Sequence, residues 1–277
     1  MSWMQYEDLS VVDGSGRAST AYDPGFFAQL VLAEDRHFWF RHRNRLIAAV
    51  LEQVVRDLPV PFNVLEVGCG TGNTLRVLEQ VCRGASVTGT DPFEEALAIA
   101  RRRVTCALVR ADVERLDLPG TFQVIGAFDV LEHIEHDVEA LKVLRSKLAA
   151  DGRLVLTVPA HHHLWSYADD AAHHYRRYSM AQLRTTLEQA GYSIEYLTPF
   201  MSWIYPLMWA RRRAAGTAHR RGQDAFALTL QDLRVIPGVN QLLLWLLAGE
   251  LGPVRRRRVL PIGTSLLAVA RAAGASR

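Results

Sequence analysis

A glycine-rich turn between a strand and a helix constrains this chain more than any other feature. Residues 63–74 read Asn-Val-Leu-Glu-Val-Gly-Cys-Gly-Thr-Gly-Asn-Thr. Val64, Leu65 and Val67 predict a short buried strand, and a helical pattern of apolar residues follows over 75–81. The three glycines permit backbone conformations that other residues avoid, and they let a ligand approach the main chain closely. A nucleotide-type cofactor at this turn is therefore the first hypothesis.

A second strand and an acidic residue follow this turn. Residues 85–90 predict a strand that leads into Asp91, 21 residues after Gly70. A carboxylate at this position can accept hydrogen bonds from both hydroxyls of a ribose. Pro92 suits the first turn of a helix predicted over 93–103. Because a nicotinamide-dependent dehydrogenase also has an acid here, Asp91 alone leaves both classes of protein open.

The rest of the chain alternates strands and helices, which predicts an α/β fold whose parallel sheet has helices on both faces. Further strands are predicted over 105–109, 122–128, 154–158, 192–198 and 264–270, which brings the sheet to seven strands. We divide the chain into an N-terminal arm and helical lid (1–58), a cofactor-binding core (59–199), a helical insertion (200–262) and a last strand with the tail (263–277). The lid is predicted as one helical segment over 25–56.

Four motifs, one of them Asp91 at the end of the second strand, occur in the order found in class I S-adenosylmethionine (SAM)-dependent methyltransferases. Glu66 with the glycine turn resembles the first motif of that family, and residues 110–113 (Arg-Ala-Asp-Val) resemble its adenine-binding motif. Residues 131–134 (Leu-Glu-His-Ile) resemble a signature of its small-molecule members, which include the quinone-biosynthesis O-methyltransferases. The resemblance covers about residues 37–198 and the last strand. It implies a Rossmann-like fold, SAM as the cofactor and S-adenosylhomocysteine as the product.

The resemblance also implies which residues hold the cofactor. Asp112 would accept a hydrogen bond from the adenine amino group, and the backbone amide of Val113 would face the ring. Arg43 lies where related O-methyltransferases direct an arginine at the SAM carboxylate. The predicted cofactor-binding residues are Arg43, Glu66, Gly68, Cys69, Gly70, Gly72, Asp91, Pro92, Asp112, Val113 and Phe128. The motif around Asp112 disfavours the alternative of an NAD(P)-dependent oxidoreductase.

Two histidines are the candidate catalytic residues. The methyl group of a sulfonium is already activated, so the protein must align the acceptor and, for an oxygen acceptor, remove a proton. His133 follows the fourth strand at the carboxyl edge of the sheet, where such folds bind ligands. His174 lies in a histidine-rich segment after the fifth strand. A packing role for His133, at the start of the next helix, is an equal alternative.

Two metal hypotheses arise from these segments. Asp129, Glu132 and His133 have the spacing i, i+3, i+4, and related quinone-pathway enzymes carry a similar acid-x-x-Glu-His pattern tied to magnesium. Asp129 departs from the Glu usual there, so magnesium stays open but not favoured, and no residue is predicted as a metal ligand. Five histidines within 161–174 suggest zinc. Neither a thiolate nor a regular ligand spacing supports that hypothesis.

The segment 164–178 resembles a block found in a subgroup of bacterial small-molecule methyltransferases. Its Leu-Trp-Ser start and Arg-Arg-Tyr end favour a substrate loop, in which the two arginines bind a carboxylate or phosphate. The alternative is that these arginines pair with acids of the same domain. The predicted substrate-binding residues are Trp39, Asp169, Tyr175, Arg176, Arg177 and Tyr178.

The insertion over 200–262 departs from the family plan, in which the last two strands form a tight hairpin. It begins with an aromatic and methionine-rich stretch and carries arginine runs at 211–213 and 255–258. Three roles stay open: a hydrophobic cap over the substrate, a homo-oligomer interface, and peripheral contact with an anionic membrane surface. Its apolar run is too short to span a bilayer.

Composition sets the remaining expectations. A net charge of +3 gives no nucleic-acid footprint. The polar N-terminus lacks the pattern of a signal peptide. Three cysteines in predicted core or cofactor segments favour a reducing compartment, so a cytoplasmic location is expected. The expected partner is a small, partly hydrophobic molecule, lipid-like or anionic, with O-methylation favoured. A SAM-binding or membrane-surface protein without methyl transfer is a further alternative.

Overall fold

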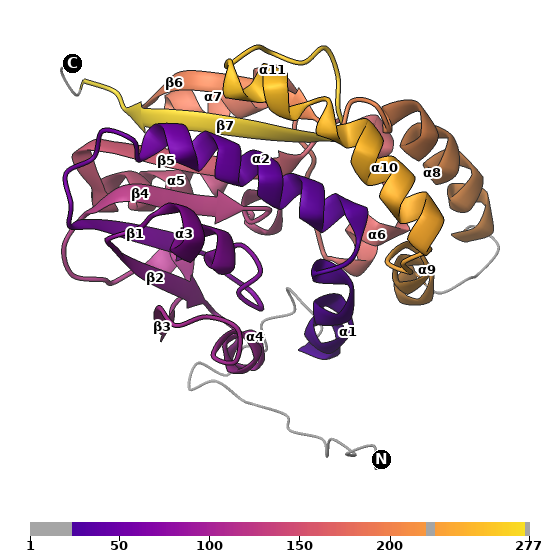
Figure 1. The fold of residues 1–277 in the computed structure, drawn as a ribbon, viewed down its shortest axis with the longest axis horizontal. Coiled ribbons are helices and arrows are strands. Elements are labelled where there is room, and N and C mark those ends of the chain that lie inside the picture. Colours follow the sequence, from indigo (N-terminus) through magenta and orange to yellow (C-terminus); the bar gives the residue numbers. More distant parts are fainter. Residues whose placement is uncertain (1–23, 220–224, 275–277) are drawn as a thin grey trace.

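A seven-stranded sheet forms the centre of the protein in the computed structural model (Figure 1), which describes residues 24–219 and 225–274. The strands are β1 (Phe62–Val67), β2 (Ala85–Asp91), β3 (Ala107–Arg110), β4 (Phe122–Phe128), β5 (Leu148–Pro159), β6 (Tyr192–Phe200) and β7 (Ser265–Ala272). Their order is β3-β2-β1-β4-β5-β7-β6, and β7 is antiparallel to both of its neighbours. The predicted seven-stranded Rossmann-like sheet is confirmed. Most of the predicted N-terminal arm lies outside the described residues.

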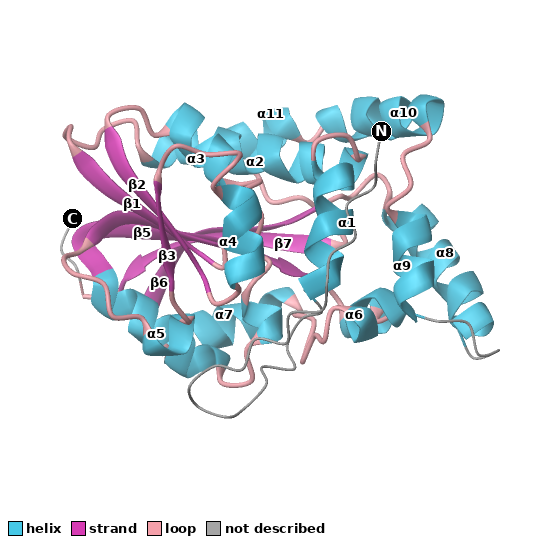
Figure 2. Cartoon of the chain, turned by 90° about the horizontal axis from the view of Figure 1, so that it is seen from below, coloured by secondary structure: helices cyan, strands magenta, loops and turns pink. Residues whose placement is uncertain are grey.

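Helices cover both faces of the sheet (Figure 2). They are α1 (Pro24–Glu34), α2 (Phe38–Val54), α3 (Leu75–Val81), α4 (Glu94–Ala100), α5 (Asp137–Lys147), α6 (Tyr167–Ala171), α7 (Met180–Gln189), α8 (Tyr205–His219), α9 (Ala225–Asp232), α10 (Pro237–Ala248) and α11 (Leu251–Arg255). Short 3₁₀ turns are η1 (Val113–Arg115), η2 (Leu131–His133) and η3 (His162–Leu164). None of the described helices is both long and apolar enough to cross a bilayer.

Two apolar clusters, one on each face, hold the sheet between its helices. Val64 of β1 belongs to the cluster formed with α2, α3 and α10, while the next residue, Leu65, belongs to the cluster formed with α5 and α7. This alternation follows from the two-residue period of a strand. Strands β1, β2, β4 and β5 run parallel, so the segments that follow them meet at one edge of the sheet.

The lid is two helices rather than the single segment predicted over 25–56. The break lies at residues 35–37, where the Nδ1 atom of His37 accepts a hydrogen bond of 3.3 Å from the Trp39 amide. Asn240 of α10 completes the break, because its Oδ1 atom accepts from the Phe38 amide at 2.6 Å and its Nδ2 atom donates to the Arg36 carbonyl at 2.9 Å. Since these partners come from about 200 residues away, local sequence could not predict the break.

The insertion between β6 and β7 is helical, as predicted, and it is part of the core. Helices α10 and α11 pack on α2, and α9 packs on α6. The buried carboxylate of Glu250 accepts hydrogen bonds from the amides of Met201 (2.9 Å) and Ser202 (2.6 Å) and lies 3.1 Å from the His42 ring. Glu250 thereby joins the insertion to the end of β6 and to the lid helix α2.

Candidate active site

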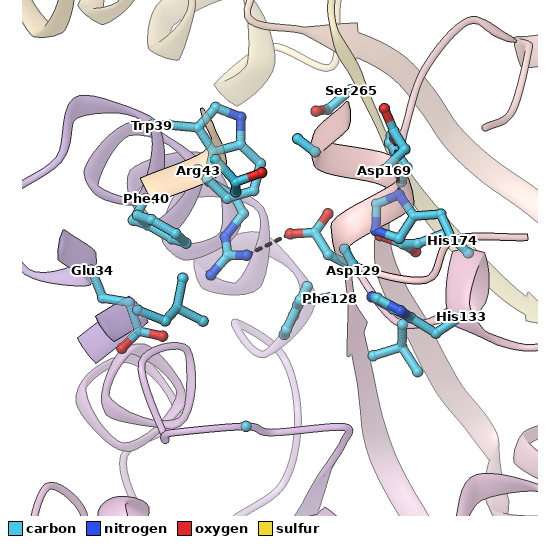
Figure 3. Close-up of a pocket in the computed structure, with 18 of the residues that line it drawn as sticks. Glu34, Trp39, Phe40, Arg43, Phe128, Asp129, His133, Asp169, His174 and Ser265 are labelled. Carbon is cyan, nitrogen blue, oxygen red and sulfur yellow. Dashed lines mark hydrogen bonds and ion pairs between the residues drawn. The ribbon is translucent and has the colours of Figure 1, made fainter. Parts of the chain in front are cut away.

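A cavity of about 910 Å³ opens at the carboxyl edge of the sheet (Figure 3). Its wall combines the glycine turn, the ends of β2, β4 and β5, the lid helices, the segment after α6, and the insertion helices α8 to α10. A cavity of this size can hold a nucleotide cofactor together with a small second ligand. The elements for which cofactor and substrate contacts were predicted therefore meet in one space.

The three glycines of the turn have different roles. Gly68, Gly70 and Gly72 have φ values of 60°, 52° and 81°, in the left-handed region that favours glycine. A Cβ atom on Gly68 would lie 2.6 Å from a methyl group of Val130, so close packing excludes a side chain there. A Cβ atom on Gly70 would meet nothing within 4 Å, and this residue lines the cavity. Gly72 packs against Ala100 and does not line the cavity, so the structure gives it a packing role and its cofactor contact stays a prediction.

Asp91 holds the glycine turn while lining the cavity. Its Oδ2 atom accepts a hydrogen bond of 2.8 Å from the Gly70 amide, and its Oδ1 atom accepts one of 2.9 Å from the Phe93 amide. Burial raises the pKa of Asp91 to about 6, although the hydrogen bonds from Phe93 and Gly70 oppose this shift. The Phe93 bond also explains why α4 begins at Glu94, after Pro92, rather than at the predicted residue 93. The carboxylate thus connects the turn, the start of α4 and the cavity.

Glu66 lies beneath the glycine turn and does not line the cavity. The Thr74 hydroxyl donates a hydrogen bond to its Oε1 atom, whereas its Oε2 atom has no hydrogen-bond partner among the described residues. Burial raises the pKa of Glu66 to about 8. In the structure Glu66 therefore connects the turn to the start of α3, and its cofactor contact stays a prediction.

The raised pKa of Glu66 predicts a pH-dependent stability. The folded state holds this proton up to about pH 8, whereas an ordinary glutamate loses it near 4.5. The free energy of unfolding should therefore fall as the pH rises from 4.5 to 8, and Glu66→Gln should remove roughly 1–3 kcal/mol of that fall. Denaturant unfolding of both proteins without cofactor, at pH 5.5 and 8.5, measures this. The same loss of stability in both proteins would contradict the prediction.

Arg43 projects from the lid helix α2 into the cavity. Its guanidinium forms an ion pair with Asp129 (Figure 3). The Cζ atom of Arg43 lies 4.9 Å from the ring centroid of Trp39 and 5.5 Å from that of Phe40. The Oδ1 atom of Asp129 in turn accepts a hydrogen bond of 3.0 Å from the Thr157 hydroxyl. Arg43 therefore combines a positive charge, a rigid setting and access to the cavity, which suits the binding of an anionic group.

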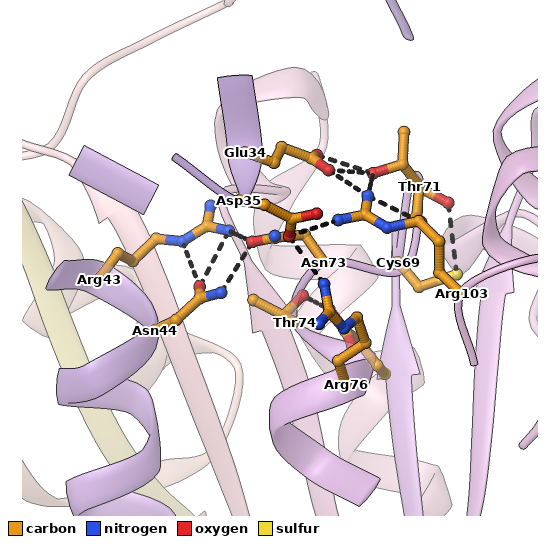
Figure 4. A network of polar contacts seen from close by, with 12 residues as sticks. Glu34, Asp35, Arg43, Asn44, Cys69, Thr71, Asn73, Thr74, Arg76 and Arg103 are labelled. Carbon is orange, nitrogen blue, oxygen red and sulfur yellow. Dashed lines mark hydrogen bonds and ion pairs between the residues drawn. The ribbon is translucent and has the colours of Figure 1, made fainter. Parts of the chain in front are cut away.

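A polar network fastens α1 to the glycine turn (Figure 4). The Thr71 hydroxyl donates to the buried Glu34 carboxylate at 2.6 Å, and Arg103 forms an ion pair with the same carboxylate. Arg76 and Arg103 both pair with Asp35, at 2.7 and 2.9 Å. Glu34, Thr71 and Arg103 could not be predicted from sequence patterns, because no local motif connects residues so far apart along the chain.

The residues predicted to bind the adenine also lie at the cavity. Asp112 is exposed there, and its Oδ1 atom accepts a hydrogen bond of 3.0 Å from the Glu114 amide at the start of η1. Nine of the eleven predicted cofactor residues line the cavity: Arg43, Gly68, Cys69, Gly70, Asp91, Pro92, Asp112, Val113 and Phe128.

His133 and His174 meet at the cavity wall although 41 positions separate them. Their ring centroids lie 4.6 Å apart with the planes at 80° (Figure 3). Burial, together with the neighbouring His174, lowers the pKa of His133 to about 3. His133 is therefore neutral at physiological pH. Both roles predicted for it fit this position, since it lies in η2 and lines the cavity.

Asp169 orients His174. The Oδ1 atom of Asp169 lies 2.9 Å from the Nδ1 atom of His174 and accepts a hydrogen bond of 2.6 Å from the Arg177 side chain. Its Oδ2 atom accepts from the Ser166 amide at 2.8 Å and lies 3.5 Å from the Arg212 guanidinium. Burial alone would raise the pKa of Asp169, but the hydrogen bond from His174 and the two arginines hold it well below its usual range. Asp169 is therefore a fixed carboxylate.

Four of the six predicted substrate contacts line the cavity: Trp39, Asp169, Tyr175 and Arg177. The other two do not. The Tyr178 hydroxyl donates to Asp137 at 2.7 Å, and Arg176 pairs with the same carboxylate at 3.1 Å. Arg176 and Tyr178 thus anchor the loop to the start of α5, as the alternative of pairing with acids of the same domain expects for the arginine, and their substrate contact stays a prediction.

The metal hypotheses change with this geometry. Asp129 pairs with Arg43 and Thr157, so it does not join Glu132 and His133 as one ligand set. Within residues 24–219 and 225–274, the group of three ligand-type side chains that converges is Glu132, His133 and His174, with atoms within 4.8 Å of one another. One carboxylate and two imidazoles suit magnesium poorly, because magnesium requires oxygen ligands. The histidine run at 161–163 contributes to no such group among these residues.

The activity of this protein should therefore be unchanged by EDTA. The prediction follows because Asp129 pairs with Arg43, and because burial, together with Asp129, raises the pKa of Glu132 well above its usual range. Neither acid therefore offers a free carboxylate to a metal ion. Initial rates with and without EDTA, and after addition of magnesium, measure this. Inactivation by EDTA with recovery in magnesium would contradict it.

The strand order with an antiparallel β7, the glycine turn after β1 and the acids at the ends of β2 and β3 match the fold of the class I SAM-dependent methyltransferases. A family model described as "Methyltransferase domain" matches residues 39–197, which is more than half of the chain, and the chain belongs to this family.

Curated relatives match part of the chain. It is 32% identical over 102 residues to the mitochondrial ubiquinone biosynthesis O-methyltransferase of Schizosaccharomyces pombe, covering 34% of this chain and 36% of that protein. It is 33% identical over 118 residues to the trans-aconitate 2-methyltransferase of Methylobacterium nodulans, covering 42% and 45%. The matched region thus spans less than half the length of these relatives.

Solved structures share the fold over most of the chain. A SAM-dependent methyltransferase from Clostridium acetobutylicum superposes with a TM-score of 0.53 at 11% identity, covering 84% of this chain and 92% of that one. The plantazolicin methyltransferase BpumL, solved with S-adenosylhomocysteine, gives 0.55 at 14% identity and covers 91% of each chain. The alternative of an NAD(P)-dependent oxidoreductase is excluded by the family match.

Proposed function

We propose that this methyltransferase transfers the methyl group of SAM to a hydroxyl oxygen of a small, partly hydrophobic acceptor. The observation that carries the proposal is the pair formed by Asp169 and His174 at the cavity wall. When bound, SAM supplies a methyl group already activated by a positively charged sulfur. The remaining tasks, which are to orient the acceptor and to remove its proton, belong to side chains of this chain.

His174 is the general base in this proposal. A carboxylate can only accept hydrogen bonds, so the Nδ1 atom of His174 carries the proton that points at Asp169. The Nε2 atom is then the one that takes the acceptor's proton. Because Arg177 and the Ser166 amide keep Asp169 ionised and fixed, the charge that develops on the His174 ring is stabilised.

The cofactor end is divided between three charged residues. Asp91 would accept hydrogen bonds from the ribose and Asp112 one from the adenine, since both carboxylates line the cavity, at the ends of β2 and β3. Arg43 would bind the carboxylate of the amino-acid part.

The acceptor end is more apolar than the cofactor end. The insertion contributes Leu207, Met208, Ile236, Val239 and Leu243 to the cavity wall. This wall supports an acceptor with apolar parts, and the O-methyltransferases among the relatives support oxygen as the acceptor atom. A cytoplasmic location is part of the proposal, supported by three free cysteines.

Two binding measurements and one activity screen test the proposal. S-adenosylhomocysteine should bind with micromolar affinity and NADH should give no heat in calorimetry, because NADH lacks the amino-acid carboxylate that Arg43 would bind. Isotope-labelled SAM should transfer methyl groups to phenols or quinols in a panel that also contains carboxylic acids and amines. Transfer to amines alone would contradict O-methylation. Cofactor binding without turnover across the panel would favour the SAM-binding protein without methyl transfer.

A further inference from the structure

The outer face of α10 is apolar although it is exposed. Val239, Leu242 and Trp245, spaced three residues apart on one side of the helix, are 51%, 55% and 70% exposed. The neighbouring Leu246 is 37% exposed, and Trp203, 65% exposed, lies against the end of the helix at Gly249. We call Val239, Leu242, Trp245, Leu246 and Trp203 the α10 patch. Figures 1 and 2 both place α10 at the periphery of the molecule. Contiguous exposed apolar residues of this kind mark an interaction surface.

The α10 patch is continuous with the cavity. Val239 belongs to the patch and also lines the cavity. Leu207 of α8 and Ile236, each 55% exposed, likewise contribute to both the surface and the cavity wall. An apolar path therefore leads from the surface, between α8 and α10, to the acceptor end of the site.

Charge in the chain segments that contain the patch is mainly positive. Residues 233–263 contain five arginines and a single acidic residue, Glu250, which is buried. Residues 201–219 contain three arginines and no acidic residue. Of these eight arginines, six are exposed: Arg211, Arg213, Arg234, Arg255, Arg256 and Arg258. Arg211 pairs with Asp232, and Arg255 lies 3.6 Å from the exposed Glu52 of α2. The patch thus lies within arginine-rich segments in which exposed positive charge outnumbers the acids that pair with it.

This positive charge favours an anionic lipid surface over a second copy of the chain as the partner of the patch. Two copies of the α10 patch brought face to face would place arginines against arginines, which opposes association. An anionic lipid surface would attract the same arginines and accept the apolar side chains. The two tryptophans suit the boundary between headgroups and acyl chains.

We propose that the α10 patch docks on the surface of an anionic lipid bilayer. Helix α10 then lies in the plane of the interface with Leu242 and Trp245 toward the acyl chains, while Arg255, Arg256 and Arg258 face the phosphates. The opening between α8 and α10 faces the lipid. The docking proposal does not depend on the proposed reaction. The entry of a lipid-dissolved acceptor through this opening depends on the docking and on the proposed reaction.

Vesicle co-sedimentation of the full chain tests the docking. Wild-type protein should bind phosphatidylglycerol–phosphatidylcholine vesicles and lose affinity as salt rises, because exposed charges are screened. Leu242→Glu and Trp245→Glu should each weaken binding by about tenfold or more, since a charge replaces an apolar contact. Gln241→Glu, at an exposed polar position of the same helix, adds the same charge and should retain most of the binding. Calorimetry with S-adenosylhomocysteine should give the same affinity for all four proteins, which shows that each is folded.

Three results would overturn the proposal. The first is a wild-type protein that does not bind anionic vesicles. The second is equal vesicle binding by the Trp245→Glu and Gln241→Glu variants. The third is a wild-type dimer in light scattering that Trp245→Glu converts to monomer without any vesicle binding, which would assign the patch to a second copy of the chain. Methyl transfer to a water-soluble acceptor, measured without vesicles, tests the proposed reaction separately.

Discussion

His174→Ala should lower the kcat of methyl transfer by about 10²–10⁴-fold, the usual contribution of a positioned general base. The substitution removes the ring that Asp169 orients and leaves the glycine turn, Asp91 and Asp112 untouched. The affinity for S-adenosylhomocysteine should therefore stay near that of the wild type. Steady-state kinetics with the acceptor found in the screen, together with calorimetry of the cofactor product, separate the two effects.

The neighbouring His173 provides the matched control. It is exposed and has a φ of 52°, a conformation that Asn tolerates, so His173→Asn changes a histidine in the same loop without straining the backbone. This variant should keep the wild-type kcat. If His174→Ala also kept it, His174 would be a structural partner of Asp169 and the acceptor would lose its proton to another group.

Asp91→Ala should weaken the binding of S-adenosylhomocysteine by about 1.5–3 kcal/mol, or roughly 10- to 150-fold. The carboxylate would no longer serve a ribose, and the amides of Gly70 and Phe93 would lose their acceptor. Two causes therefore act in the same direction. Titration calorimetry measures the affinity, and unfolding without ligand measures how much of the loss comes from the turn itself.

Asp112→Ala is the comparison for this prediction. Asp112 is exposed and accepts one backbone hydrogen bond, from Glu114. Its removal should leave the ligand-free protein as stable as the wild type and should weaken only cofactor binding. An Asp91→Ala protein that bound S-adenosylhomocysteine as tightly as the wild type would show that the ribose is held by other groups.

Much of the cofactor site could be predicted because it depends on short-range patterns. A buried strand followed by glycines, and another followed by an acid, bring their ends to the same edge whenever the strands are parallel. Gly70, Asp91 and Asp112 therefore reach one cavity, as expected. His133 and His174 were predicted from separate segments, and both line that cavity.

The sequence by itself determined the sheet, the position of the glycine turn and the residue types available at its edge, because periodicity and backbone preference are local properties. Only the tertiary structure decided which partner each charge takes. Arg43 pairs with Asp129, Arg176 and Tyr178 share Asp137, and Asn240 ends the first lid helix. These pairings depend on packing between elements 40 to 200 residues apart, since burial makes an unpaired charge or amide costly and any nearby partner can satisfy it.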